Sequence, residues 1–164
     1  MSSPLQAGGS APRSEPALRL TLTVLAVIGL GIAGYLTVVH YDGSSPVCLA
    51  GGESCSKVQS SEYAELVGIP VPLIGLFGYL TVLAAALLPG DVGRFGGVFA
   101  GLVGVGFSAY LTYLEIFEIE AICQWCVASA LLMCLVLALS LYRALRFGGV
   151  DRDLGASSEL RGAT

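Results

Sequence analysis

Residues 20–41 read LTLTVLAVIGLGIAGYLTVVHY and contain no Asp, Glu, Lys or Arg. A helix rises about 1.5 Å per residue and the hydrocarbon core of a bilayer is about 30 Å thick, so about 20 apolar residues cross it. This stretch is therefore long enough to span a membrane. Three more uncharged stretches follow at residues 66–90, 95–114 and 121–142. The sequence thus predicts four membrane-spanning segments.

The composition of the 164-residue chain supports this prediction. Hydrophobic residues make up 55% and charged residues only 12%, whereas soluble domains carry about 25% charged residues. Within lipid each span must satisfy its own backbone hydrogen bonds, which a helix does. We therefore expect an all-α membrane protein, a four-helix transmembrane bundle with an outer loop that contains a short helix. The scattered Lys and Arg residues form no basic stripe, which excludes nucleic-acid binding.

The basic residues predict the orientation of the bundle. Seven of the eight fall on one side of the predicted spans: Arg13, Arg19, Arg94, Arg143, Arg146, Arg152 and Arg161. Only Lys57 falls on the other side. By the positive-inside rule both termini are cytoplasmic, and the loop 42–70 and the turn 115–120 face outward. The first span exceeds the roughly 7–15 apolar residues of a signal-peptide core, so we expect it to be retained.

One apolar domain with a polar segment on each side is expected. Residues 1–16 read as a disordered cytoplasmic leader, residues 17–147 as the bundle and residues 148–164 as a disordered cytoplasmic tail.

The outer loop carries signals for local structure. Ser61 followed by Glu62 is typical of a helix N-cap with an acid in the first turn, which predicts a short helix over residues 62–67. Because proline is tolerated in a first helical turn, the second membrane helix should begin near Pro70 to Pro72.

Glycine patterns inside the spans are better explained by packing than by nucleotide binding. Gly29, Gly31 and Gly34 match the GxGxxG spacing, but they lie within an apolar span and lack the preceding strand that dinucleotide binding needs. Together with Gly97 and Gly101 they favour a role in letting helices approach closely.

Four of the five cysteines are predicted to lie on the outer side. Cys48 and Cys55 belong to the outer loop, while Cys123 and Cys126 form a CxxC motif at the outer start of the fourth span. Cys134 falls deeper in that span, and we expect it to pack as an apolar thiol.

Two dithiol pairs in one compartment indicate redox chemistry. Residues three apart share a helix face, and a helix N-terminus stabilises the reactive thiolate of a CxxC. Disulfide exchange requires that one sulfur attack another directly. A cysteine pair in a loop can approach both a soluble partner protein and the CxxC pair at the membrane. Two alternatives stay open, namely structural disulfides and a four-cysteine zinc site. Trp125, inside the CxxC, is either an interfacial anchor or part of a quinone pocket.

The order of these motifs resembles the vitamin K epoxide reductase family, in its bacterial branch. The resemblance covers about residues 18–146 and rests on Cys48, the run CSKV from Cys55, Ser61, the proline-marked second helix and the motif CQWC at 123–126. It implies a four-helix transmembrane bundle around a quinone, menaquinone or ubiquinone, capped by the outer loop.

The resemblance also implies roles for individual residues. Cys48 would exchange with a substrate protein, Cys55 would pass electrons to Cys123, and Cys126 would reduce the quinone, with Ser61 near the quinone and the cysteines. The expected function is that of a thiol:quinone oxidoreductase in the bacterial plasma membrane. Its implied partner is a separate extracytoplasmic thioredoxin-fold protein of the DsbA type.

One departure from the family bears on the substrate. Ala130 stands four residues after Cys126, where animal members have a tyrosine, and this difference argues against vitamin K epoxide as the substrate. Reduction of vitamin K quinone or its epoxide is therefore the alternative activity and not the expected one, and a non-enzymatic structural or zinc-binding membrane protein is a more distant alternative.

Overall fold

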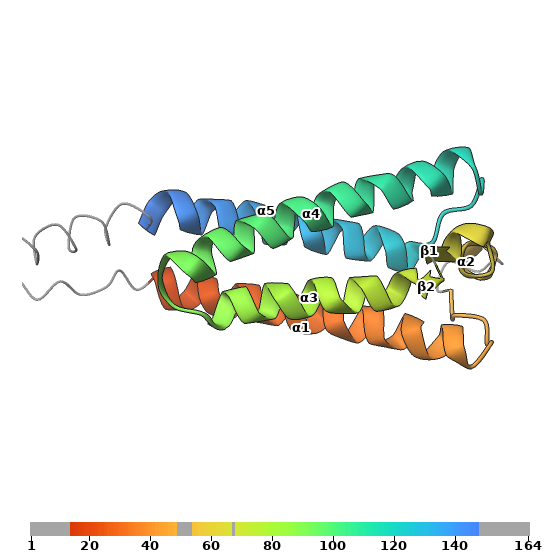
Figure 1. The fold of residues 1–164 in the computed structure, drawn as a ribbon, viewed down its shortest axis with the longest axis horizontal. Coiled ribbons are helices and arrows are strands. Elements are labelled where there is room, and N and C mark those ends of the chain that lie inside the picture. The colour runs from red at the N-terminus through yellow and green to blue at the C-terminus, as the bar shows by residue number, and fades with distance from the viewer. Residues whose placement is uncertain (1–13, 49–53, 67, 148–164) are drawn as a thin grey trace, which may run out of the picture.

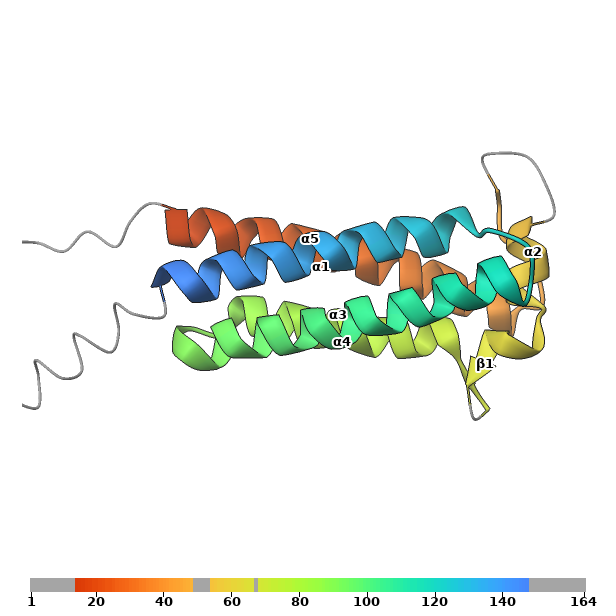
Figure 2. The same cartoon turned by 90° about the horizontal axis from the view of Figure 1, so that it is seen from above.

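The computed structural model describes residues 14–48, 54–66 and 68–147 of the chain. Within these ranges the four main helices run roughly alongside one another (Figures 1 and 2). They are α1 (Ser14–Tyr41), α3 (Val71–Leu87), α4 (Gly90–Phe117) and α5 (Gln124–Phe147). Most contacts join α1 to α3 and α5, and α4 to the same two helices, so the bundle closes as a ring. The predicted all-α bundle is confirmed.

The outside of the bundle is apolar. Among the described residues, α1, α4 and α5 are long and apolar enough to cross a membrane. Large side chains such as Phe99 and Leu145, 70% and 77% exposed, project from this surface. Exposed apolar area of this extent is compatible with lipid and not with water.

Helix α3 is shorter than the uncharged stretch 66–90 predicted, at 17 residues. It starts just after Pro70, with Pro72 in its first turn, which confirms the predicted start. At its other end the Arg19 guanidinium of α1 donates to the carbonyl oxygens of Ala86 and Leu87. The last carbonyl oxygens of a helix have no hydrogen-bond donor within the helix, so the guanidinium of Arg19 supplies the donors for the end of α3.

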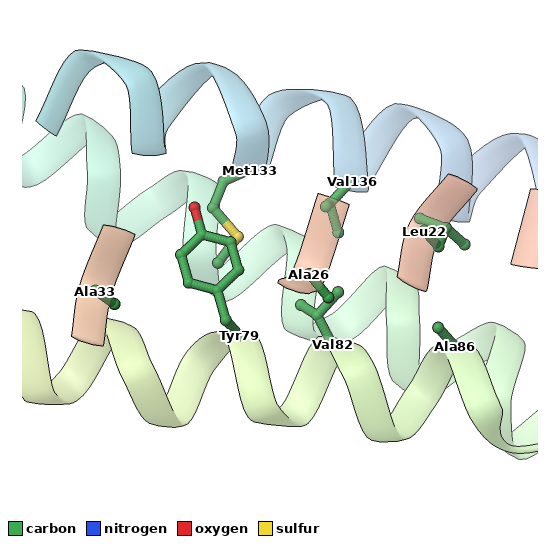
Figure 3. Close-up of a cluster of buried hydrophobic side chains, with 8 residues drawn as sticks. All are labelled: Leu22, Ala26, Ala33, Tyr79, Val82, Ala86, Met133 and Val136. Carbon is green, nitrogen blue, oxygen red and sulfur yellow. The ribbon is translucent and has the colours of Figure 1, made fainter. Parts of the chain in front are cut away.

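Small residues allow the helices to pack closely around the core. The core residues in Figure 3 are Leu22, Ala26, Ala33, Tyr79, Val82, Ala86, Met133 and Val136. A Cβ atom at Gly29 would lie 2.0 Å from Cε1 of Tyr79, and one at Gly101 would lie 3.0 Å from Cα of Leu137. These glycines serve close helix packing, as predicted, whereas Gly31 and Gly34 face open space.

Buried charges tie three helices together at the end of the bundle where α1 starts and α5 ends. Glu15 Oε1 lies 3.1 Å from Arg143 Nε and 3.9 Å from Arg94 Nη2. Arg143 is 1% exposed and Arg94 is 8% exposed. Glu15 thus belongs to α1, although residues 1–16 were expected to form a leader. It pairs most closely with Arg143, whereas Arg94 also pairs with Asp91 at 3.2 Å.

The opposite end of the bundle is covered by the segment between α1 and α3 (Figure 1). This segment contains α2 (Ser54–Gln59), the 3-10 helix η1 (Glu62–Ala64), β1 (Glu65–Leu66) and β2 (Ile69–Pro70). The two strands pair antiparallel, with Glu65 opposite Pro70. His40 at the end of α1 lies 3.4 Å from Glu65 and holds this hairpin against the bundle.

The predicted short helix over residues 62–67 is wrong in its position. Only the 3-10 turn Glu62–Ala64 forms there, and β1 begins at Glu65. Ser61 does not cap it, because its hydroxyl donates to the carbonyl oxygen of Val58 at 2.8 Å. The short helix of the outer loop is instead α2, which carries Cys55.

Candidate redox site

The loop cysteines are joined in a disulfide bond. Cys48 and Cys55 have a Cα–Cα distance of 6.3 Å, and Cys55 is 1% exposed on α2. Cys48 is half-buried and lies seven positions after the end of α1, in a stretch without regular secondary structure. The outer loop therefore presents an oxidised pair whose N-terminal member is the more accessible one.

The CxxC cysteines are free thiols at the start of α5. Cys123 immediately precedes the helix and is fully buried, and Cys126 lies in its first turn. The Cys126 thiol donates a hydrogen bond to the Cys123 sulfur and lowers the pKa of Cys123 to about 7, against the opposing effect of burial. Backbone N–H groups of Trp125 and Cys126 act in the same direction. The lowered pKa favours the thiolate, which is the form of a cysteine that attacks a disulfide.

Trp125 connects the CxxC to the outer loop. Its indole Nε1 donates to the carbonyl oxygen of Val47 at 3.0 Å, and the Val47 N–H donates to the Tyr35 hydroxyl at 3.0 Å. The Tyr35 and Trp125 rings pack with their centroids 5.4 Å apart. Because Val47 precedes Cys48, these contacts hold the loop disulfide at the same end of the bundle as the CxxC.

A cavity of about 380 Å³ lies below this end, between the four main helices and the outer segment. Its wall is mostly apolar, and the lining residues extend along α4 from Phe99 to Glu115. At the rise of an α-helix these 16 steps span about 24 Å. Phe99 and Val103 are also exposed on the outside of α4, so the cavity reaches the apolar surface of the bundle.

Three residues predicted to lie near a quinone, namely Ser61, Trp125 and Cys126, all line this cavity. The few other polar groups on its wall include the hydroxyl of Tyr79, which interacts with the Ser129 hydroxyl at 2.9 Å. An elongated and mostly apolar volume with polar groups on its wall suits a lipid-soluble ring with an isoprenoid chain. The residues present therefore fit a quinone.

Glu115 is a site residue that the sequence analysis did not identify. It was expected in an outward turn over residues 115–120, but α4 continues to Phe117 and the Glu115 side chain points inward. Glu115 is 4% exposed, and its Oε2 accepts a hydrogen bond from the backbone N–H of Cys123 at 3.1 Å. An acid next to a long apolar stretch was the available signal, because ionisable groups within membranes are usually functional.

Two further expectations change with the structure. Cys134, expected to be packed, is exposed on α5, since it follows the inward-facing Met133 by one position and so points about 100° away from it. A four-cysteine zinc site is incompatible with a Cys48–Cys55 disulfide. Within the described ranges, no group of three or more potential metal ligands is present.

Comparison with known proteins agrees with the geometry. The chain is 36% identical over 110 residues to the thiol-disulfide oxidoreductase LTO1 of Arabidopsis thaliana. The aligned region covers 60% of this chain and 29% of LTO1, so the chain matches less than a third of that relative's length. The model of the vitamin K epoxide reductase family matches residues 20–141. This range contains both cysteine pairs and most of the four main helices. The resemblance seen in the sequence is thereby confirmed, and the chain belongs to the vitamin K epoxide reductase family.

Proposed function

We propose that this protein is a membrane thiol:quinone oxidoreductase that supports disulfide bond formation. It reoxidises an extracytoplasmic thioredoxin-fold protein of the DsbA type and passes two electrons to a membrane quinone, menaquinone or ubiquinone. One observation carries the proposal: Cys126 lines an apolar cavity while its partner Cys123 lies outside that lining, at the end of the bundle that holds the loop disulfide.

The order of the sulfurs supports a relay. Cys48, the more accessible loop cysteine, receives the thiolate of the partner protein and forms a mixed disulfide. Resolution of this mixed disulfide oxidises the partner and leaves Cys48 and Cys55 reduced. Cys55 then exchanges with Cys123 of an oxidised CxxC, each step being attack of a thiolate on a disulfide. The two electrons finally leave through Cys126, the cysteine at the cavity wall.

The chain's own residues supply the conditions for this chemistry. The lowered pKa of Cys123 provides a thiolate near neutral pH. Trp125 and Tyr35 hold the segment before Cys48 in place, and Ser61 contributes to the cavity wall beside the outer segment. Quinone supplies a two-electron acceptor that dissolves in the bilayer, and the apolar cavity wall excludes water from it.

The distribution of charge supports an orientation of the bundle in its membrane, which we place as the bacterial plasma membrane. Arg19, Arg94 and Arg143 lie near the end where α1 begins and α5 finishes, and the cysteine pairs lie at the other end. By the positive-inside rule the arginine end is cytoplasmic and the cysteines face outward.

Purified protein in lipid nanodiscs provides the test. With a small dithiol or a reduced thioredoxin-fold protein as donor, menaquinone or ubiquinone analogues should be reduced catalytically, followed by quinone absorbance. Turnover with vitamin K epoxide but with neither quinone would replace this proposal by the epoxide reductase alternative. No thiol oxidation with any of these acceptors would contradict an oxidoreductase.

A further inference from the structure

Glu115 places a carboxyl group between the CxxC and the cavity. Its Oε2 accepts a hydrogen bond of 3.1 Å from the backbone N–H of Cys123. The Cys126 side chain is a second hydrogen-bonding neighbour of this carboxyl group, so the single thiol proton can turn from the Cys123 sulfur to Glu115, which also lines the cavity. Glu115 therefore lies beside both CxxC cysteines and faces the volume where a quinone fits.

A tight turn after α4 places Cys123 next to the Glu115 side chain. After α4 the chain turns back sharply: the Ala121 N–H donates to the Glu115 carbonyl oxygen at 3.0 Å, and Glu120 adopts a φ of 52°. A non-glycine residue with positive φ adopts a backbone conformation that residues with a Cβ atom disfavour. This turn brings the N–H of Cys123 within reach of the Glu115 side chain.

Few other groups at the cavity can carry a proton. Among the described lining residues, η1 contributes Tyr63, α3 contributes Tyr79, and α5 contributes Cys126, while the lining residues of α1 have no titratable side chain. The Tyr79 hydroxyl already forms a hydrogen bond with the Ser129 hydroxyl. Glu115 is the only carboxyl group in that lining.

Resting on the proposed function, we infer that Glu115 is a catalytic residue that moves the proton of the Cys126 thiol to the quinone. The carboxylate accepts the Cys126 proton as the Cys123–Cys126 disulfide bond forms, and then delivers it to a quinone oxygen. Starting from ionised Cys123, one thiol proton and one proton from water join the two electrons released by the sulfurs. The products are one disulfide and one quinol, so charge and atoms balance.

The inference requires a carboxyl group and not only a hydrogen-bond acceptor. Glu115→Gln keeps an oxygen that can accept from the Cys123 N–H but cannot relay a proton. General acid–base catalysis contributes about 10²–10⁴-fold, so the kcat of quinone reduction should fall by at least about 100-fold. The KM for quinone should stay within about twofold, because the cavity wall is otherwise unchanged. Glu118→Gln is the matched control, three residues further along at the exposed end of α4.

Three measurements separate proton transfer from positioning. Nanodisc-embedded variants are compared for kcat, for the solvent deuterium isotope effect on kcat, and for rescue by Glu115→Asp, which keeps the acid on a shorter stem. The inference expects a low kcat with an increased isotope effect in Glu115→Gln, partial rescue by Glu115→Asp, and wild-type kinetics in Glu118→Gln. If Glu115→Gln does not fold, the kcat and the solvent isotope effect of Glu115→Asp are compared with those of the wild type, and this comparison tests the inference.

Two outcomes would overturn the inference. The first is a wild-type kcat in Glu115→Gln. The second is an equal loss of kcat in Glu115→Gln and Glu115→Asp with an unchanged solvent isotope effect, which would indicate that Glu115 only positions its neighbours. Absence of quinone reduction by the wild-type protein would instead contradict the proposed function.

Discussion

The indole nitrogen of Trp125 donates a hydrogen bond of 3.0 Å to the carbonyl oxygen of Val47. Trp125 lies between the two CxxC cysteines, and Val47 precedes the first cysteine of the loop disulfide. This one contact links two segments that are 78 positions apart in sequence. Trp125 also lines the cavity, so the cavity wall, the CxxC and the outer loop share one side chain.

Trp125→Phe should slow electron passage from the loop pair to the CxxC. Phenylalanine keeps an aromatic ring but loses the bond to Val47, and a typical hydrogen bond contributes about 0.5–1.5 kcal/mol, or about 2- to 12-fold in rate. Rapid mixing of the fully oxidised protein with a small dithiol, quenched by alkylation, measures how fast electrons pass from the loop pair to the CxxC. Tyr110→Phe, an exposed aromatic on α4, serves as the control. Unchanged exchange in Trp125→Phe would show that the contact does not position the loop.

Cys126→Ser should abolish quinone reduction, because it removes the sulfur at the cavity wall. Cys55→Ser should do the same by breaking the relay one step earlier. Cys134→Ser is the matched control on α5, since this thiol is exposed on the outside of the helix. The measurement is quinone absorbance with a dithiol donor, and full activity of Cys126→Ser would reject the assignment of the inner pair.

Cys48→Ser should block electrons from a thioredoxin-fold protein while leaving some turnover with a small dithiol. The reason is that Cys48 is the accessible loop cysteine and Cys55 is buried. Parallel assays with the two donors give the comparison. Equal losses with both would argue against Cys48 as the sulfur that meets the partner.

The pKa of Cys123 should rise from about 7 toward its ordinary value of 9.0 in Cys126→Ala. The Cys126 thiol is the main group that stabilises the Cys123 thiolate, and alanine cannot donate a hydrogen bond. At pH 8 Cys123 is therefore mostly thiolate in the wild type and mostly thiol in the variant. A pH titration of thiolate absorbance checks this, with Cys134→Ala as the control. Coincident titrations of Cys126→Ala and wild type would contradict the hydrogen bond.

Gly29→Ala should destabilise the bundle, because the new Cβ would lie 2.0 Å from Cε1 of Tyr79. Overpacking of this kind costs about 1–3 kcal/mol. Gly34→Ala on the same helix meets no heavy atom within 4 Å and should leave stability nearly unchanged. Thermal unfolding in detergent gives the two midpoints, and equal values would show that α1 and α3 can separate at little cost.

The sequence predicted the bundle because lipid imposes a simple requirement. A span needs about 20 apolar residues and internally satisfied backbone groups, and both are visible in the chain itself. Pro70 and Pro72 likewise marked the start of α3 through their fixed backbone angle. The spacing of Cys123 and Cys126 predicted a shared helix face, since three residues make almost one turn. In the structure Cys123 immediately precedes α5 and only Cys126 lies in its first turn.

The loop was predicted less well, because its structure depends on contacts with the bundle. Ser61 and Glu62 carried a local helix signal, yet the hairpin that pairs Glu65 with Pro70 and the contact of Glu65 with His40 of α1 outweigh it. Such short elements have too few residues for propensity to decide.

The order of cysteines, the apolar spans and the placement of basic residues were thus set by the sequence alone, because each depends on distance along the chain. Tertiary structure alone decided that Glu115 turns inward to Cys123, that Trp125 reaches Val47, and that Cys126 rather than Cys123 lines the cavity. The physical reason is that a side chain's partner across the bundle depends on how four helices rotate and pack against one another. That packing is a property of the whole assembly and of no single segment.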